Sequence, residues 1–208
     1  MSSIDKSSSK KSCGQMLLNL LHSRSGHFLT ESGRHSDVWF NSQNLFKEPN
    51  QLSPIVSELG KKITRHTFDI VCGPMFGGAQ IAKMISDEYD MDYVISERHV
   101  THDVSSPKPI VSYFIPKNSH GQVKGKKIAI VDDIINAGAA TKATYDVLIS
   151  LGAIPVLLGA LLVKGDLIYP FISSNNLSLE MISKCDNNMW LPEECPLCAA
   201  HQTLESVV

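Results

Sequence analysis

The stretch that most constrains the fold of this chain is residues 126–141, which read KKIAIVDDIINAGAAT. The apolar run from Ile128 to Val131 predicts a buried β-strand, and Asp132 and Asp133 follow at its carboxyl end. Small residues come next, immediately before a segment with a helical pattern. Because ligands of an open parallel sheet bind beyond the carboxyl ends of its strands, this stretch predicts a ligand site.

Strand and helix patterns alternate along most of the chain. Short apolar runs predict strands at residues 68–73, 92–96, 109–116, 126–133 and 154–163. Longer patterned runs predict helices at residues 14–22, 54–66, 77–89 and 139–151, with Ser53 and Pro54 marking the start of the second. Residues 25–46 suggest an extended or hairpin segment, and residues after about 177 suggest a helix followed by irregular structure. The alternation is typical of an α/β fold with a mostly parallel sheet flanked by helices.

Composition narrows the class of protein. The 208 residues are enough for one domain, and 43% hydrophobic with 19% charged residues is typical of a globular protein. A net charge of -2 gives no electrostatic case for nucleic-acid binding, and no run approaches the roughly 20 apolar residues that span a bilayer. We expect a disordered polar tail at residues 1–13 and a single domain at residues 14–208. The five cysteines, without an export signal, indicate reduced thiols and a cytoplasmic protein.

The residues after the aspartate pair are suited to binding an anion through the backbone. Ala137, Gly138, Ala139 and Ala140 carry no bulky side chain, and a helix begins near Thr141, so unpaired N–H groups and the positive end of the helix dipole point at one place. Since carboxylates repel phosphate, the partners of the aspartates should be sugar hydroxyls or Mg²⁺. Asp132 and Asp133 have two alternative interpretations. They would cap the next helix, or they would end a Walker B strand. The chain lacks, however, the G-x-x-x-x-G-K-[ST] loop that a nucleotide triphosphatase needs.

Residues 126–141 resemble the phosphoribosyl pyrophosphate (PRPP) motif of the type I phosphoribosyltransferases. Asn136 stands at a position that usually holds Thr or a similar polar residue. VCGPMFGGAQIA resembles the pyrophosphate loop of that family, and GHFLTESGRHSDVWFN resembles the N-terminal hood segment of the orotate enzymes. WLPEECPLCAAHQTLE resembles the C-terminal signature of an orotate phosphoribosyltransferase-like bacterial subgroup. The resemblance covers nearly all of the chain after Gly14. It implies the type I fold with a small hood built from residues 14–50 and 177–208.

The resemblance also implies an activity. Phosphoribose would pass from PRPP to a nitrogenous base, with orotate as the leading acceptor, Mg²⁺ bridging pyrophosphate and ribose oxygens, and a homodimer as the assembly. Asp132 and Asp133 would bind the ribose hydroxyls. The residues implied to bind the 5-phosphate are Asn136, Ala137, Gly138, Ala139, Ala140 and Thr141. Those implied to bind pyrophosphate are Gly73, Pro74, Met75, Phe76, Gly77 and Gly78; alone, they would read equally well as a plain strand-to-helix turn.

The chain departs from the family pattern in its base-binding segment. The implied base-binding residues are Glu31, Ser32, Gly33 and Arg34, and Glu31 occupies the position of a lysine that contacts the orotate carboxylate. Two carboxylates that face each other repel. Either another cation such as Arg34 serves, or the acceptor is a purine or another heterocycle.

The second departure lies in the mobile catalytic loop. Arg98, His99 and His102 stand where the family has an Arg-Lys-Glu-x-Lys-x-His cluster, and they are the candidates for stabilising pyrophosphate or transferring a proton. The alternative is a solvated loop with ordinary histidines. A protein that kept the PRPP site and lost catalysis would be a PRPP- or nucleotide-binding regulator.

The C-terminal cysteines suggest a further site. Cys195 and Cys198 have C-x-x-C spacing, and Cys185 and His201 lie nearby in sequence, so these four are candidate ligands of a structural zinc. A second well-spaced pair is missing, however. The preferred interpretation is therefore a reduced pair packed against Trp190.

Overall fold

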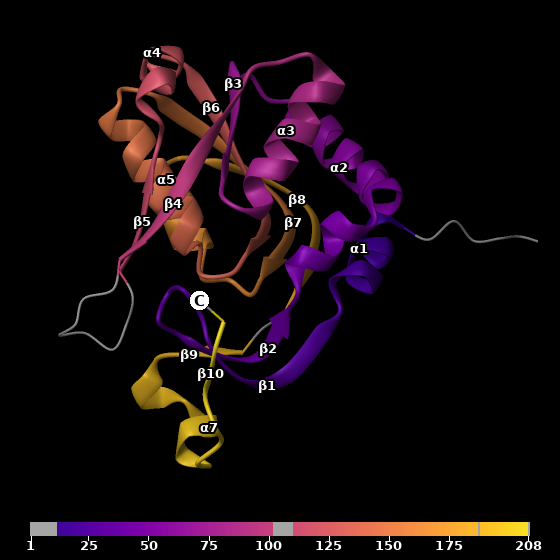
Figure 1. Ribbon diagram of the computed structural model, residues 1–208, viewed down its shortest axis with the longest axis vertical. Helices are drawn as coiled ribbons and strands as arrows, with labels where there is room; N and C mark the ends of the chain where they lie inside the picture. The colour runs from indigo at the N-terminus through magenta and orange to yellow at the C-terminus, as the bar shows by residue number, and fades with distance from the viewer. Residues whose placement is uncertain (1–11, 102–109, 187, 208) are drawn as a thin grey trace, which may run out of the picture.

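A six-stranded sheet forms the centre of the protein, seen in a computed structural model that describes residues 12–101, 110–186 and 188–207 (Figure 1). Its strand order is β5-β4-β3-β6-β7-β8, and every neighbouring pair is parallel except β4 and β5. The strands are β3 (Ile70–Pro74), β4 (Tyr93–Thr101), β5 (Ile110–Phe114), β6 (Lys127–Ile135), β7 (Ile154–Lys164) and β8 (Ser178–Cys185). The predicted mostly parallel α/β sheet is confirmed.

Helices cover both faces of this sheet (Figure 1). Successive side chains of a strand point to opposite faces, so Ala129 and Val131 of β6 belong to one core cluster, and Ile128 and Ile130 to the other. The first cluster includes residues of α1 (Cys13–Leu21), α2 (Pro49–Ile63) and α3 (Gly77–Tyr89). The second includes residues of α4 (His120–Val123), α5 (Ala139–Ser150) and α6 (Tyr169–Ser174), and α4 follows the short 3₁₀ turn η2 (Lys117–Ser119).

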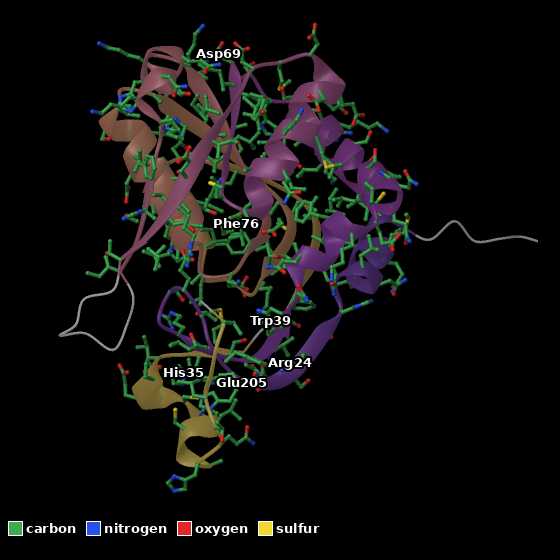
Figure 2. All side chains as sticks on the ribbon, viewed as in Figure 1. Arg24, His35, Trp39, Asp69, Phe76 and Glu205 are labelled. Carbon is green, nitrogen blue, oxygen red and sulfur yellow. The ribbon has the colours of Figure 1, made fainter. Side chains whose placement is uncertain are left out.

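A second, four-stranded sheet with order β10-β1-β2-β9 forms a hood below the core in Figure 1. Strands β1 (Ser23–Leu29) and β2 (His35–Phe40) form an antiparallel hairpin, and the segment after β2 continues as η1 (Ser42–Lys47). The C-terminal segment adds β9 (Met189–Trp190), η3 (Pro192–Glu194), α7 (Pro196–Ala199) and β10 (Glu205–Ser206). Strand β10 pairs with β1 in parallel, and the exposed ion pair between Arg24 and Glu205 crosses that edge (Figure 2).

Two of the predicted elements differ from the structure. Helix α2 begins at Pro49 rather than at Pro54, and Pro54 lies inside it, where the helix loses one backbone hydrogen bond. Residues 178–185 form β8, a strand, where a helix was predicted. They pair with β7 over seven residues, and this tertiary contact overrides the local pattern. Of the described residues of the tail, those from Met189 onward supply the two strands that join the hood sheet.

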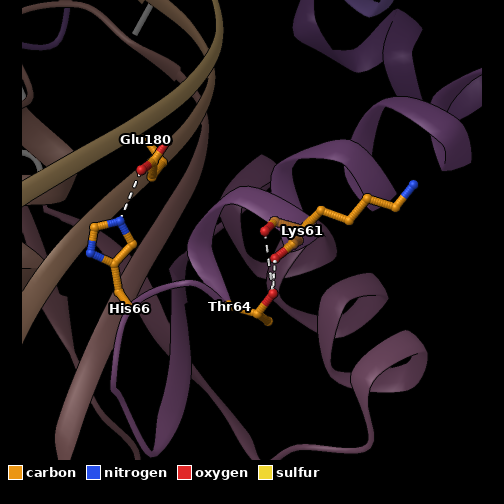
Figure 3. Close-up of polar contacts among 5 residues, drawn as sticks. Lys61, Thr64, His66 and Glu180 are labelled. Atoms are coloured by element: carbon orange, nitrogen blue, oxygen red, sulfur yellow. Dashed lines mark hydrogen bonds and ion pairs between the residues drawn. The ribbon is translucent and has the colours of Figure 1, made fainter.

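Side-chain contacts close the end of α2 and join the segment after it to β8 (Figure 3). Thr64 Oγ1 donates a hydrogen bond to the Gly60 carbonyl at 2.9 Å, which completes the last turn of the helix. His66 Nε2 lies 2.8 Å from Glu180 Oε1 on β8. The chain leaving α2 is therefore attached to the far edge of the sheet.

The N-terminal helix starts within the predicted tail. Ser12 caps α1 by accepting a hydrogen bond from the Gln15 backbone N–H at 3.3 Å, and the helix begins at Cys13. The rest of the expected tail, residues 1–11, lies outside the described residues. No helix in the part of the chain that the structure describes is long and apolar enough to span a bilayer.

Candidate active site

A cavity of about 500 Å³ opens where the carboxyl ends of the core strands face the hood. Both parts line it. The core contributes the turn after β3 and residues of β4, β5, β6 and β7, and the hood contributes residues of β1 and β2. This is the position at which an open parallel sheet binds its ligands.

The aspartate pair lies at the end of β6 and lines this cavity. Asp132 and Asp133 are only 7% and 9% exposed. Asp132 accepts hydrogen bonds from the Asp133 N–H at 3.0 Å and the Thr141 hydroxyl at 3.3 Å, and Asp133 accepts one from the Ile134 N–H at 2.7 Å. Burial raises the pKa of both carboxyls, and for Asp132 the neighbouring Asp133 charge raises the pKa further. The pair is therefore a concentrated negative site that a cation or hydroxyl donors would stabilise.

The small residues after the pair form a turn against the same cavity. All six residues from Asn136 to Thr141 line it. Gly138 precedes the first residue of α5 with a φ of 77°, which only glycine adopts without strain, and its carbonyl accepts from the Lys142 N–H at 2.8 Å. The unpaired N–H groups of the first turn of α5 are thus directed at the cavity. The predicted anion-binding turn and the aspartates are brought together.

The turn after β3 forms a second wall. Met75, Phe76 and Gly77 line the cavity, whereas Gly73, Pro74 and Gly78 are buried behind it. A Cβ on Gly73 would overlap the backbone of Gly78, and a Cβ on Gly77 would overlap the Asp133 carboxylate. Glycine is thus needed at both places because of close approach. Phe76 is 68% exposed at the lower edge of the core, facing the hood (Figure 2).

The hood wall is joined to the core by a charged contact. Glu31, in the turn between β1 and β2, accepts from Arg98 Nε of β4 at 3.2 Å and from the Tyr113 hydroxyl of β5 at 2.9 Å. Burial and the Glu31 charge raise the pKa of Tyr113, so it remains a hydrogen-bond donor. The Glu31 charge is therefore compensated within the protein, and its repulsion of an anionic ligand is reduced.

The comparison with protein families decides what this arrangement is. The model of the phosphoribosyl transferase domain matches residues 43–168, well over half of the chain, including both turns and the aspartate pair. The chain belongs to the phosphoribosyl transferase family. An orotate phosphoribosyltransferase of Campylobacter jejuni is 30% identical over 190 residues, which cover 90% of this chain and 80% of that protein. One from Caldanaerobacter subterraneus is 27% identical over 175 residues, which cover 83% of each.

Solved phosphoribosyltransferases share the fold. An orotate phosphoribosyltransferase from Aeropyrum pernix aligns with a TM-score of 0.61 at 20% identity, over 83% of this chain and 93% of that one. An adenine phosphoribosyltransferase from Thermoanaerobacter pseudethanolicus also gives 0.61, at 14% identity, over 81% and 98%. Both likenesses show the type I fold, and they do not distinguish between acceptor bases.

Several residues predicted for the phosphoribosyltransferase site lie elsewhere. Gly33 and Arg34 do not line the cavity, and Gly33, with a φ of 77°, instead completes the hairpin turn. His99 is exposed on β4 and is also outside the lining, and His102 falls outside the described residues. Glu31, Ser32 and Arg98 do line the cavity.

A cation that the sequence analysis missed is Lys164, the last residue of β7. It lines the cavity, is 4% exposed, donates to the Val38 carbonyl at 3.0 Å and lies over the Phe40 ring at 5.0 Å. Burial lowers its pKa to about 8, against a smaller opposing effect of Cys185 and Asp37. The sequence does contain a signal for Lys164, because this lysine directly follows the apolar run 154–163. In the sheet, that run lies next to the strand that carries the aspartates.

The predicted zinc ligands of the phosphoribosyltransferase do not come together as a set. Cys185 ends β8, where it pairs with Lys164 of β7, and His201 is exposed. Cys195 and Cys198 instead contact His27 and His35 of the hood hairpin. The two histidines could not be assigned from sequence spacing, because more than 150 residues separate them from the cysteines.

Proposed function

We propose that this enzyme transfers phosphoribose from PRPP to orotate, forming orotidine 5'-phosphate and pyrophosphate. In this reaction the bond between ribose C1 and the pyrophosphate oxygen breaks, a bond from C1 to a ring nitrogen of the base forms, and the hydrogen of that nitrogen leaves as a proton. The observation that carries the proposal is the buried pair Asp132–Asp133 between two backbone turns, in a cavity that the hood faces. The orotate phosphoribosyltransferases among the relatives support the choice of acceptor.

The aspartates would act most strongly in the transition state. C1 gains positive charge as the pyrophosphate leaves, and two carboxylates in a site with little water stabilise that charge more than they do the neutral sugar. The raised pKa of each carboxyl reflects a charged form that burial disfavours, and a developing cation would relieve this cost. In the ground state, both would accept hydrogen bonds from ribose hydroxyls.

The two turns would hold the phosphate groups. Residues 136–141 would bind the 5-phosphate through backbone N–H groups at the start of α5. Met75, Phe76 and Gly77 would bind pyrophosphate, with the N-terminus of α3 behind them. The buried Oδ1 of Asn136 has no hydrogen-bond partner among the described residues, and a ligand hydroxyl would satisfy it.

Magnesium fits this donor set. Asp132 and Asp133 are hard oxygen ligands beside the expected pyrophosphate position, and they would hold the ion through PRPP or directly. When bound, Mg²⁺ supplies charge neutralisation of the leaving pyrophosphate.

The base would lie against the hood, where Lys164 is the cation for the orotate carboxylate. Its Nζ is fixed by the Val38 carbonyl and the Phe40 ring, so a carboxylate entering beside β2 would meet an ammonium group held in place. Arg34, the cation suggested by the sequence, is outside the cavity lining. The aromatic rings of Trp39 and Phe40, which also line the cavity, offer apolar surface to a planar base.

The experiment is an incubation of the full chain with PRPP, Mg²⁺ and orotate, adenine or hypoxanthine in parallel, read by mass spectrometry. We expect orotidine 5'-phosphate and pyrophosphate with orotate, and no product when both aspartates are replaced by Asn. A nucleotide formed from a purine alone would replace orotate as the acceptor. PRPP binding by calorimetry without any product would indicate a regulator.

We also propose that the enzyme is a cytoplasmic homodimer. All five cysteines are free thiols in the structure, and free thiols are typical of a reducing compartment such as the cytoplasm. A symmetric dimer is the expectation that follows from the resemblance to the orotate enzymes. Light scattering at micromolar concentration should give twice the mass of the chain, and the chain mass itself would contradict the dimer.

A further inference from the structure

Four side chains of the hood direct their donor atoms at one another. His27 lies on β1, His35 begins β2, and Cys195 and Cys198 belong to the C-terminal segment around α7. Their ligand atoms all lie within 4.8 Å of one another, and all but Cys198 are buried. Figure 2 labels His35 beside this C-terminal segment, away from the cavity edge marked by Phe76. The cluster is separate from the PRPP site, because none of the four lines the cavity.

The spacing is close to that of a tetrahedral metal site. His27 Nε2 lies 2.9 Å from His35 Nδ1 and 3.4 Å from Cys195 Sγ. Cys198 Sγ lies 3.2 Å from His35 Nδ1 and 3.7 Å from His27 Nε2. Tetrahedral zinc bonds to nitrogen and sulfur imply ligand separations of about 3.3–3.8 Å. These four distances differ from that range by less than about half an ångström, and the remaining separations are no longer than 4.8 Å, so small side-chain rotations would bring the four atoms around one ion.

The contact on the outer side of His27 fixes which nitrogen faces the cluster. His27 Nδ1 lies 3.0 Å from the backbone carbonyl of Gln202. A carbonyl only accepts, so Nδ1 carries the hydrogen, and neutral His27 presents the lone pair of Nε2 to the other three groups. Metal-bound histidines are commonly oriented by such a carbonyl on the opposite ring nitrogen.

Hydrogen bonding alone satisfies this cluster poorly. Three donor atoms, His35 Nδ1 and the two sulfurs, converge on the single lone pair of His27 Nε2. One lone pair accepts one good hydrogen bond, whereas a central cation binds all four atoms at once. Thiols are weak hydrogen-bond donors, so placing the two thiols around an imidazole gains little without a metal.

We propose that His27, His35, Cys195 and Cys198 bind a structural Zn²⁺ ion. Two imidazoles and two thiolates form a set that prefers zinc over the hard cation of the PRPP site. All four coordination positions come from the protein, which leaves none open for substrate, so the site is structural. Binding displaces the two thiol protons to solvent, and the ring hydrogen of neutral His35 moves from Nδ1 to Nε2, which frees the Nδ1 lone pair for the ion.

The ion would fasten the C-terminal segment to the hood hairpin. Just beyond the cysteines, β10 pairs with β1, and the Val207 N–H donates to the Leu29 carbonyl at 3.3 Å. Val207 lines the cavity, so the ion would hold one wall of the base side in position. It joins residues 168 positions apart, His27 and Cys195, and so restrains the unfolded chain as a cross-link does.

The test is metal analysis of the full chain expressed in medium with zinc and purified without chelator. Plasma mass spectrometry should give about one zinc per chain, and Cys198→Ser should reduce it to less than about a tenth. Cys198→His keeps a ligand and should restore binding. Co²⁺ exchanged into the wild type should show the intense visible absorption of a tetrahedral site with thiolate ligands, and Cys198→Ser should lack it.

Matched variants separate this set from the one suggested by sequence proximity. Cys185→Ser and His201→Ala should keep about one zinc per chain. Alkylation of the wild type, mapped by mass spectrometry, should find Cys195 and Cys198 protected until zinc is removed. Wild-type protein that contains no zinc and takes up neither Zn²⁺ nor Co²⁺ would overturn the proposal. A Cys195–Cys198 disulfide, or loss of the metal in Cys185→Ser, would do the same.

Discussion

Replacing Lys164 by Met tests the assignment of the base site most directly. Lys164 is buried in the cavity and held by the Val38 carbonyl and the Phe40 ring, so Met keeps the length of the side chain and removes only the charge and its hydrogen bonds. If Lys164 binds the orotate carboxylate, the Michaelis constant for orotate should rise, while that for PRPP should change little.

The size of the effect follows from the kind of contact. A charge-assisted hydrogen bond contributes about 1.5–3 kcal/mol, which corresponds to a loss of about 10- to 150-fold in kcat/KM for orotate. The variant should remain folded, because replacing a buried ammonium by an apolar isostere is commonly neutral or stabilising.

The pH dependence adds a second, independent signature. With a pKa of about 8, Lys164 is mostly protonated at pH 7 and mostly neutral at pH 9, so kcat/KM for orotate should fall about tenfold between them. Lys164→Met should lack this decrease. Stability should respond in the opposite direction: burial lowers the pKa in the folded state, so the unfolded chain binds more protons, and the wild type becomes more stable as pH rises from about 8 towards 10.5.

The assay is steady-state kinetics with each substrate varied in turn, from pH 7 to 9. Lys184→Met is the matched control, because Lys184 lies on the adjacent strand β8 and pairs with Asp166 at 2.6 Å outside the cavity. Arg34→Ala tests the cation suggested by the sequence and should leave orotate kinetics unchanged. Orotate kinetics of Lys164→Met within twofold of wild type, with the alkaline decrease retained, would refute the assignment.

Three further predictions concern the PRPP side. Asp132→Asn should lower kcat by about 100- to 1,000-fold and raise the melting temperature near neutral pH. Burial raises the pKa of this carboxyl, so its charge destabilises the folded state at any pH above the pKa of the unfolded chain. In calorimetry, the increase in melting temperature should therefore vanish below about pH 4. Gly77→Ala should weaken PRPP binding at least about tenfold by displacing Asp133, whereas Gly121→Ala, which has open space around it, should not; equal affinities would contradict this turn geometry. Glu31→Gln leaves Arg98 without its counter-charge and should tighten PRPP binding a few-fold in calorimetry, and weaker binding would count against the compensating role of Glu31.

Much of the PRPP side could be predicted because its signals are local. Residues 126–141 contain, in order, a buried strand, two acids, a turn of small residues and the start of a helix. Because the acids end the strand, they lie at the carboxyl edge of the sheet, where ligands bind. The alternation of strands and helices likewise gave the parallel core, since each unit carries its own periodicity. The proposed phosphate-binding turns act through backbone N–H groups, so runs of small residues in the sequence are enough to predict them.

The base side and the metal cluster depend on contacts between distant segments. Lys164 reaches the cavity only because β7 lies beside β6, and the partners of Cys195 and Cys198 come from the opposite end of the chain. Residues 178–185 were predicted as a helix because their pattern is ambiguous, and pairing with β7 decides their state. Spacing along the chain suggested Cys185 and His201 as zinc ligands beside Cys195 and Cys198. The structure instead brings His27 and His35 to these two cysteines.

The position of Val207 bears on how this protein should be produced and engineered. The chain passes α7, pairs as β10 with β1 and brings Val207 to the cavity wall. A purification tag or fused reporter attached after Val208 would therefore begin one residue from the cavity lining, where it would compete with the base or hold the hood away from the core. The other end is more permissive, because α1 starts at Cys13 and none of its residues lines the cavity. Tags and surface-immobilisation handles belong at the N-terminus.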